Sequence, residues 1–287
     1  MRNIRLTLAY DGTNYVGWQV QPNGLSVQAV VETAIRKLTG QRVKILAAGR
    51  TDSGVHALGQ VANFKTACSI PDEKMRSGLQ NFLPRDIIVC HVEEADPQFH
   101  ATFSAKTKHY RYVIDNSQIR HPFVSRYTWQ YAASLDAVAM HEASQVLLGR
   151  HDFRCFESQF PNKATSVRTI FQAAVQRCFG WSVWSQAGWP RGPEQNLTVP
   201  ASLPPKPDES QPECICFDVV ADGFLYNMVR AIVGTLIKVG RHQWSADDVR
   251  RIIENQDRSQ AGETAPARGL FLVSVNYDDA EPSTPDI

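Results

Sequence analysis

Segments in which apolar and polar residues alternate recur along this chain, and segments with helical periodicity separate some of them. In the first, alternation from Ile4 to Tyr10 predicts a half-buried strand that ends at the turn Asp11-Gly12. A helix is expected next, because Ser26 can cap its N-terminus, valines and a leucine follow on one face, and Gly40 ends the run. Strands that follow one another both directly and across helices favour an α+β fold with a mixed or antiparallel sheet over a doubly wound one.

The same patterns predict the remaining elements. Strands are expected at about 43–48, 60–66, 86–93, 108–115, 168–178 and 215–219, and finally from Phe271 to Tyr277. Helices are expected after Pro71, from Ser134 to Gly149, from Phe224 to Val239, and after a capping box at Ser245 to Asp248.

One proline-rich stretch interrupts this order, because seven of the sixteen prolines fall between Ser185 and Glu213. Such a composition cannot supply a packed core, so the stretch is expected to be a mobile surface insertion. We therefore expect an N-terminal α+β half over 1–103 and a C-terminal α+β half over 104–280 with the insertion at about 185–213. An acidic tail over 281–287 completes the chain.

Composition excludes several classes of protein. With 287 residues, 43% hydrophobic and 21% charged, the chain can bury a full core without disulfides. The longest apolar run, about 217–239, contains charged residues, so neither a membrane span nor a secretory signal is expected. The six cysteines are dispersed and form no CxxC pair, which disfavours a disulfide framework or a metal site. Free thiols without an export signal indicate a reducing, cytoplasmic compartment.

The charge is unevenly distributed. The segments Ser185 to Glu213 and Asp278 to Ile287 carry −2 and −4, so the rest of the chain carries +7 against +1 for the whole. A moderately basic body is compatible with a polyanionic ligand.

A polar loop with three glycines, Ala48 to Gln60, lies between two expected apolar strands. It holds Arg50, Asp52 and His56 within seven residues. An arginine partner would lower the pKa of Asp52 and keep it anionic, as a nucleophile requires. The spacing fits equally well an Asp52 that closes an Asx turn beside a solvated Arg50.

Arg230 stands out in the helix expected from Phe224, because its neighbours are apolar on nearly all sides. A buried guanidinium needs an anion. Asp52, a substrate phosphate and some other carboxylate are all candidates.

The third unusual segment runs from Ser104 to Tyr112 and interleaves basic residues with aromatic ones. This pattern suits a strand that lies along a phosphate backbone and offers Tyr110 for stacking on a base. It suits equally an exposed edge strand with protective lysines and core tyrosines.

At these three segments together, the chain resembles the TruA family of tRNA pseudouridine synthases. The resemblance extends from Ile4 to Tyr277, although the stretch 185–213 is longer than is expected in that family. The matching pieces are Gly49 to Ala57, Phe103-Ser104-Ala105 with Tyr110-Arg111-Tyr112, Gly223 to Arg230, and Ala265-Pro266-Ala267 with Gly269-Leu270.

The resemblance implies a fold of two related α+β halves around one continuous sheet, with a central active-site cleft. It implies isomerisation of uridine to pseudouridine in the anticodon arm of tRNA at positions 38–40, without metal or cofactor, by a homodimer. Asp52 would be the nucleophile, Tyr110 would lie against the target uracil, Arg50 would assist base flipping, and Arg230 would pair with Asp52.

Two other hypotheses stay open from the residues. A non-catalytic tRNA-binding or chaperone module would use the same basic and aromatic strand but would leave the ionisable loop unexplained. An aspartate-dependent hydrolase of a small phosphate or glycoside would act without any polynucleotide.

Overall fold

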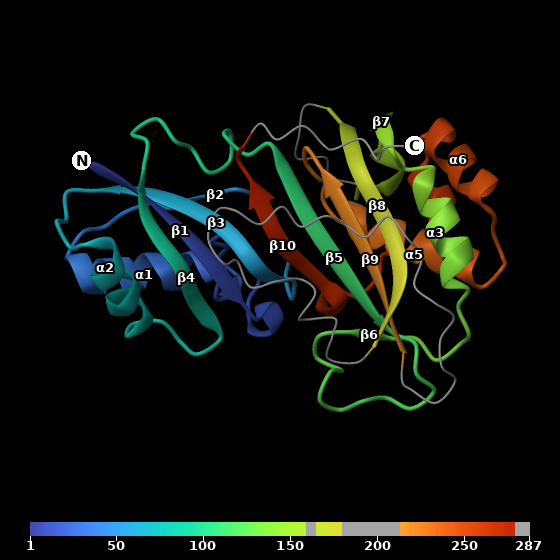
Figure 1. Ribbon diagram of the computed structural model, residues 1–287, viewed down its shortest axis with the longest axis horizontal. Coiled ribbons are helices and arrows are strands. Elements are labelled where there is room, and N and C mark those ends of the chain that lie inside the picture. Colours follow the sequence, from blue (N-terminus) through green and yellow to red (C-terminus); the bar gives the residue numbers. More distant parts are fainter. Residues whose placement is uncertain (159–164, 180–212, 279–287) are drawn as a thin grey trace.

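The computed structural model describes residues 1–158, 165–179 and 213–278. Within these residues, ten strands form one sheet in the order β4-β1-β3-β10-β5-β9-β8-β7, with β2 beside β3 and β6 beside β5 (Figure 1). The strands are β1 Arg2–Tyr10, β2 Leu46–Ala47, β3 His56–Thr66, β4 Ile87–Ala95, β5 Thr107–Asp115, β6 Trp129–Gln130, β7 Gly149–Asp152, β8 Val167–Phe179, β9 Glu213–Ala221 and β10 Leu270–Asn276.

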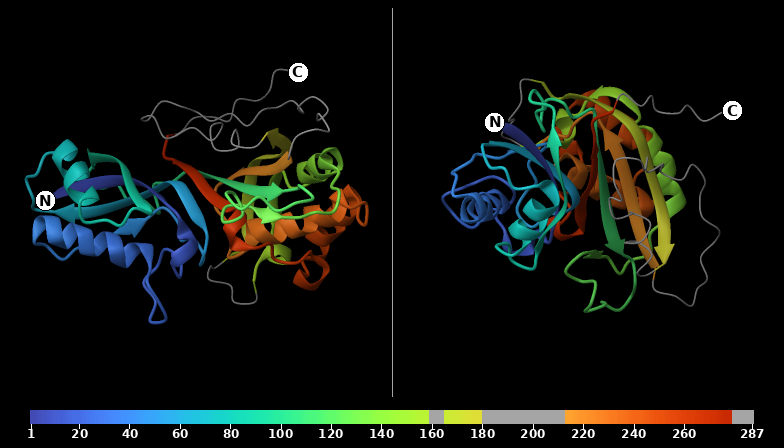
Figure 2. Two further views of the ribbon diagram at one scale, coloured as in Figure 1. Left: turned by 90° about the horizontal axis from the view of Figure 1, so that it is seen from below. Right: turned by 60° about the vertical axis from the view of Figure 1, so that its left-hand side comes forward.

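The described residues also form five α-helices. They are α1 Val27–Thr39, α2 Asp72–Gln80, α3 Ala137–Gln145, α5 Met228–Gly240 and α6 Ala246–Asn255, with 3-10 turns η1 Gly12–Asn14, η2 Arg154–Phe156, η3 Arg258–Gln260 and η4 Ala267–Gly269. Figure 2 shows α1 and α5 on the same face of the sheet. One apolar core lies beneath them, to which β1, α1, β5 and α5 all contribute buried side chains.

The N-terminal elements follow from their sequence. Ile4, Leu6 and Leu8 point into the core, as the alternation predicts. The Ser26 side chain accepts a hydrogen bond from the Ala29 N–H at the start of α1, and Gly40 ends the helix in the left-handed conformation. Both ends of α1 are therefore as predicted.

The sheet is mixed because it holds two short parallel contacts, one between β5 and β6 and one at its centre. Strands β3 and β10 pair only at His56 with Phe271 and at Ala57 with Leu272, whereas the pairs on either side are antiparallel. Beyond this contact the two strands remain close at Gly59, where a Cβ would lie 2.5 Å from Val273 O. The prediction of an α+β fold with a mixed sheet is confirmed, and the boundary at 103/104 stays a prediction.

Two predicted helices are shorter than expected. The helix expected from Ser134 begins at Ala137, because the Asp136 carboxylate accepts the N–H groups of Val138 and Ala139. It ends before Gly149, which instead begins β7.

The helix expected from Phe224 begins at Met228, because Asn227 adopts a left-handed conformation with φ 62°. Such a residue cannot lie inside a right-handed helix. Arg230 is therefore in the first turn of α5 rather than in the middle of a longer helix. The strand expected at 43–48 is reduced to Leu46–Ala47, whereas β3 begins four residues earlier than predicted.

Cys214 and Cys216 lie on the same face of β9 and share a buried cluster with Cys178. No helix of the described residues is long and apolar enough to cross a membrane. Most of the predicted insertion and the whole predicted acidic tail lie outside the described residues.

Candidate active site

Asp52 lies on the loop that joins β2 to β3, and the N-terminal segment holds this loop closely. The Trp18 N–H donates to Thr51 O at 3.0 Å. Gly17 has φ 107°, and a Cβ at Gly17 would lie 2.6 Å from Thr51 O. Only glycine permits both this conformation and this approach. The Asp52 side chain is thereby held at the surface of the loop, 20% exposed.

Arg230 faces this carboxylate from the first turn of α5. Its Nη1 lies 3.7 Å from Asp52 Oδ2, and its side chain is 17% exposed. Two other hydrogen bonds orient the guanidinium: Nε donates to Ala265 O at 2.6 Å, and Nη1 donates to Asn227 Oδ1 at 2.7 Å. Arg230 is thus a fixed, nearly buried cation beside Asp52.

The pKa of Asp52 differs from the expectation. Burial raises the pKa of this carboxyl, and the positive charge of Arg230 offsets the rise only in part, so the pKa lies above its ordinary value. The expectation that an arginine partner would lower the pKa overlooked desolvation, which sequence spacing does not reveal.

Tyr110 projects from β5 to the same place. It is 7% exposed, and its ring meets that of Phe224 edge to face, with centroids 4.9 Å apart. Burial raises the pKa of its phenol, and the nearby Tyr10 and Asp52 raise it further. Among the described residues its hydroxyl has no hydrogen-bond partner. Its phenol is therefore neutral and lies near enough to Asp52 for the charge of that carboxylate to act on it.

Arg50 is two residues before Asp52 and points elsewhere. It is exposed, and within the described parts of the chain it makes no hydrogen bond or ion pair. The side chain of Lys108 approaches the same turn, since a Cβ at Gly49 would lie 3.6 Å from Lys108 Nζ. This side of the loop is thus exposed and cationic.

His56 lies apart from these groups. Its Nδ1 accepts the Gly12 N–H at 3.0 Å, its Nε2 lies 3.2 Å from Arg268 O, and its ring stacks on Phe271. The third ionisable group of the loop is therefore buried in the junction between β3 and β10.

The structure agrees only in part with the expectations for the segment 104–112, which were a strand along a phosphate backbone or an exposed edge strand. Strand β5 lies between β10 and β9, so it is not an edge strand. His109 and Arg111 are buried and both bind Asp218 of β9, with Nε2 and Nε respectively 2.6 and 2.9 Å from Asp218 Oδ1. These two side chains face Asp218, and Tyr110 points to the opposite face of the sheet because successive side chains alternate.

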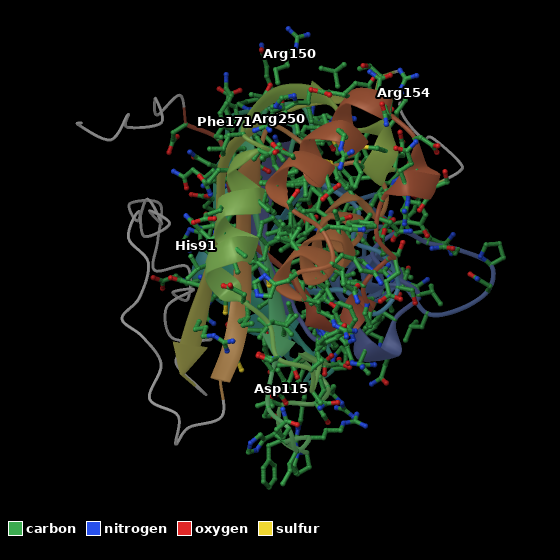
Figure 3. All side chains as sticks on the ribbon, turned by 90° about the vertical axis from the view of Figure 1, so that its right-hand side faces the viewer. His91, Asp115, Arg150, Arg154, Phe171 and Arg250 are labelled. Carbon is green, nitrogen blue, oxygen red and sulfur yellow. The ribbon has the colours of Figure 1, made fainter. Side chains whose placement is uncertain are left out.

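Several other basic residues lie on the C-terminal elements. Figure 3 shows Arg150, Arg154 and Arg250 at the outer end of the C-terminal elements. Arg154 pairs with Asp152, and Arg168 is buried and donates to Thr165 O.

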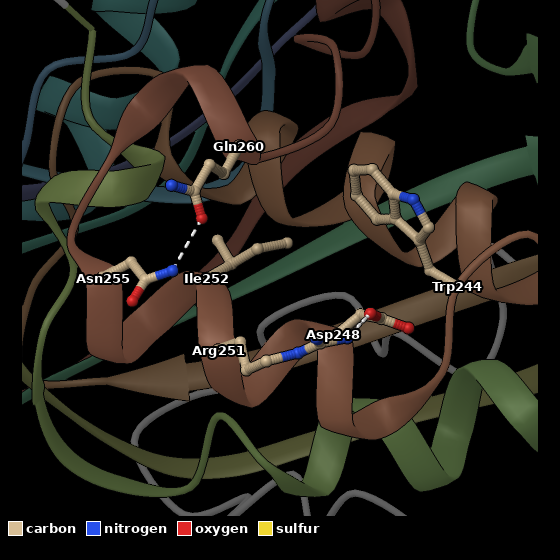
Figure 4. Close-up of a pocket in the computed structure, with 6 residues that line it drawn as sticks. All are labelled: Trp244, Asp248, Arg251, Ile252, Asn255 and Gln260. Carbon is tan, nitrogen blue, oxygen red and sulfur yellow. Dashed lines mark hydrogen bonds and ion pairs between the residues drawn. The ribbon is translucent and has the colours of Figure 1, made fainter.

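A small cavity of about 230 Å³ also lies away from the site (Figure 4). It is lined by Trp244, Asp248, Arg251, Ile252, Asn255 and Gln260. No group of three or more His, Cys, Asp or Glu side chains that could hold a metal ion occurs in the described ranges.

The sequence interpretation missed three residues beside Asp52. The hydroxyls of Tyr10 and Thr51 are 2.8 Å apart, and Gln60 Nε2 donates to Gly49 O at 2.8 Å. Thr51 and Gln60 belong to the polar loop that the sequence analysis singled out, so the sequence offered a signal for both. Tyr10 carried no signal beyond its place at the end of a strand.

A carboxylate with an arginine beside it and a phenol nearby is an arrangement that can carry out acid-base or nucleophilic chemistry. The family model described as tRNA pseudouridine synthase matches residues 7–104 and 143–278. The tRNA pseudouridine synthase A of Acetivibrio thermocellus is 42% identical over 277 residues, which cover 96% of this chain and 100% of that protein. Those of Pelobacter propionicus and Thermoanaerobacter sp. are 40% and 39% identical with the same coverage. The chain therefore belongs to the tRNA pseudouridine synthase family and is an isomerase.

Proposed function

We propose that this protein isomerises uridine to pseudouridine in the anticodon stem-loop of tRNA, at positions 38–40, with Asp52 as its catalytic group. The observation that carries the proposal is the convergence of Asp52, Arg230 and Tyr110 from three separate segments. The curated relatives, each named tRNA pseudouridine synthase A, support the substrate class.

The reaction rearranges bonds within one nucleoside. The N1–C1′ bond breaks, the uracil turns while it is held, and a C5–C1′ bond forms. The proton leaves C5 and N1 gains one, so no atom is gained or lost. Because the isomerisation is redox-neutral, it needs no electron carrier, and we propose that it proceeds without metal or cofactor.

Asp52 supplies the anion that this sequence of steps needs near C1′ and C6. Attack on the sugar, attack on the base and removal of a ribose proton all begin with the carboxylate. Arg230 makes that form available, because its charge opposes the effect of burial on the pKa of Asp52.

In this proposal Tyr110 stacks on the uracil and, as a neutral phenol, orients the base that takes the C5 proton. The target nucleotide must first leave its helix, which costs unstacking energy. Arg50 is exposed beside Asp52, where it can contact the RNA and occupy the place of the extruded base.

The test is tritium release from C5-labelled uridine in tRNA. Wild type should release tritium, whereas Asp52→Asn should release none above background while it still binds tRNA. Asp247→Asn, which changes an exposed carboxylate on α6, is the matched control and should keep wild-type release. Full tritium release by Asp52→Asn would contradict the assignment of Asp52 as the nucleophile. No release by wild type would contradict the proposed synthase function.

The alternatives differ in their products and salt dependence. A binding module would hold tRNA without forming a product that carbodiimide labelling detects. A hydrolase of small molecules would turn over without RNA, and its rate would be insensitive to salt, since salt sensitivity comes from phosphate contacts.

We further propose that the protein acts as a homodimer in the cytoplasm, with an N-terminal half over 1–103 and a C-terminal half over 104–280. Sedimentation equilibrium of the full chain, with and without tRNA, tests the dimer.

A further inference from the structure

We propose that Tyr10 and Thr51 form a hydrogen-bonded brace, anchored by Gln60, that positions the Asp52 carboxylate for reaction. The inference rests on the function proposed above and assigns positioning roles to residues that do not themselves touch the reacting atoms.

The first observation is that the contact with Arg230 alone does not hold Asp52 in place. The separation of 3.7 Å between Arg230 Nη1 and Asp52 Oδ2 is longer than a hydrogen bond. Arg230 instead makes its short hydrogen bonds to Ala265 O and Asn227 Oδ1. The direction of the carboxylate must therefore come largely from its own loop.

The second observation is that buried side chains tie this loop to the sheet. Tyr10, at the end of β1, is 5% exposed, and its Oη lies 2.8 Å from the Oγ1 of Thr51, the residue before Asp52. Gln60, on the adjacent strand β3, is fully buried. Its Nε2 donates to Gly49 O at 2.8 Å and lies 3.5 Å from Tyr10 Oη.

The orientation of the Gln60 amide follows from its partners. A carbonyl oxygen only accepts, so the group that faces Gly49 O must be the NH₂. The amide then offers its second proton to Tyr10 Oη, and the Tyr10 hydroxyl can donate to Thr51 Oγ1. The Gln60 Oε1 atom is left buried without a partner among the described residues. A lost acceptor contact of this kind is costly, and it is consistent with a side chain placed for its donors.

The brace holds the loop on both sides of Arg50, at Gly49 and at Thr51. With these two points fixed, Arg50 is turned towards solvent and Asp52 towards Arg230 and Tyr110. A misplacement of about 1 Å at a reacting group costs roughly a hundredfold in rate. A hydroxyl that locks the residue before Asp52 should therefore act on the chemical step and leave RNA binding unchanged.

The experiment compares variants of the full chain by tritium release from tRNA. Tyr10→Phe and Thr51→Val each remove one hydroxyl, and each should lower kcat about ten- to hundredfold with KM for tRNA within about twofold of wild type. Thr51→Ser keeps the hydroxyl and should restore most of kcat. The double variant Tyr10→Phe/Thr51→Val should be no worse than either single one, because both remove the same hydrogen bond.

Tyr277→Phe is the matched control. It also removes a phenolic hydroxyl that makes a 2.8 Å hydrogen bond, but to Ala101 O and not to Gly49 or Thr51 of the Asp52 loop. Its Tm should fall about as much as that of Tyr10→Phe, while its kcat should stay at the wild-type value.

Any of three results would overturn the brace. Tyr10→Phe could keep the wild-type kcat, a variant could change KM without changing kcat, or the losses of kcat could multiply in the double variant. An equal loss of kcat in Tyr277→Phe would also overturn it, because the effect would then be general destabilisation. If Tyr10→Phe does not fold, the difference between Thr51→Ser and Thr51→Val decides. Inactive wild type would instead contradict the proposed function itself.

Discussion

The guanidinium of Arg230 lies beside the carboxylate of Asp52 without a short hydrogen bond to it, 3.7 Å away. The first residue comes from α5 and the second from the loop between β2 and β3. The arginine thus acts on Asp52 mainly through its charge, and the consequences can be measured.

Replacement of Arg230 should change the pH dependence of the reaction. Burial already raises the pKa of Asp52, and Arg230 opposes that rise. Arg230→Gln should therefore raise the pKa of Asp52 further, so the acidic limb of kcat/KM moves to higher pH. Arg230→Lys keeps a positive charge and should shift the limb less. Tritium release measured across pH checks this, and a shift to lower pH would contradict it.

Gly17 should be needed for activity as well as for stability. A Cβ at this position, with φ 107°, would lie 2.6 Å from Thr51 O and displace the residue before Asp52. Gly17→Ala should cost about 1–3 kcal/mol of unfolding free energy and lower kcat at least about tenfold.

Gly40 provides the control for this substitution, because it also has a positive φ but a Cβ there would meet no neighbouring atom within 4 Å. Gly40→Ala should cost about 1 kcal/mol of stability and leave kcat unchanged. Urea unfolding and tritium release give the two quantities. Equal kcat values in the two variants would contradict the proposed role of the close approach.

Asp218 should stabilise the fold strongly. Burial raises the pKa of its carboxyl, but the hydrogen bond from His109 and the charges of His109 and Arg111 outweigh burial, and the pKa is lowered. Asp218→Asn should cost about 3–5 kcal/mol at neutral pH, as removal of one partner of a buried ion pair does.

The sign of the pH dependence follows from that lowered pKa. The contribution of Asp218 is present above the unfolded carboxyl pKa of about 4 and is lost as the pH falls towards the folded value, so wild type and Asp218→Asn should converge in acid. Asp247→Asn breaks only an exposed pair with Arg250 and should cost less than about 1 kcal/mol. Denaturant unfolding at several pH values checks both, and a difference that grows in acid would contradict the assignment.

Arg50 should contribute to RNA binding through its charge. The KM for tRNA should rise with salt, and Arg50→Gln should reduce the slope of log KM against log salt by about one. Arg250→Gln, at the outer end of the molecule in Figure 3, should leave the slope unchanged. An unchanged slope in Arg50→Gln would exclude a phosphate contact.

Local patterns predicted most elements of the fold. The alternation in β1, the caps of α1 and the capping box of α6 involve residues within four positions of one another, so their energetics are readable from the chain. The prediction was wrong where a single residue overrode the pattern. Asn227, in a left-handed conformation, makes α5 begin later than expected, and Asp136 caps α3 so that the helix begins at Ala137 rather than at Ser134.

The sequence by itself determined the types and order of the elements, the polar loop around Asp52, and the candidates Arg50, Tyr110 and Arg230. Only the tertiary structure decided that Arg230 faces Asp52 while Arg111 faces Asp218, and that Tyr10 reaches Thr51. It also decided the direction of the pKa of Asp52, because desolvation depends on every atom packed around the carboxylate. Contacts between distant segments and the burial they produce are properties of the folded chain, and no spacing along the sequence encodes them directly.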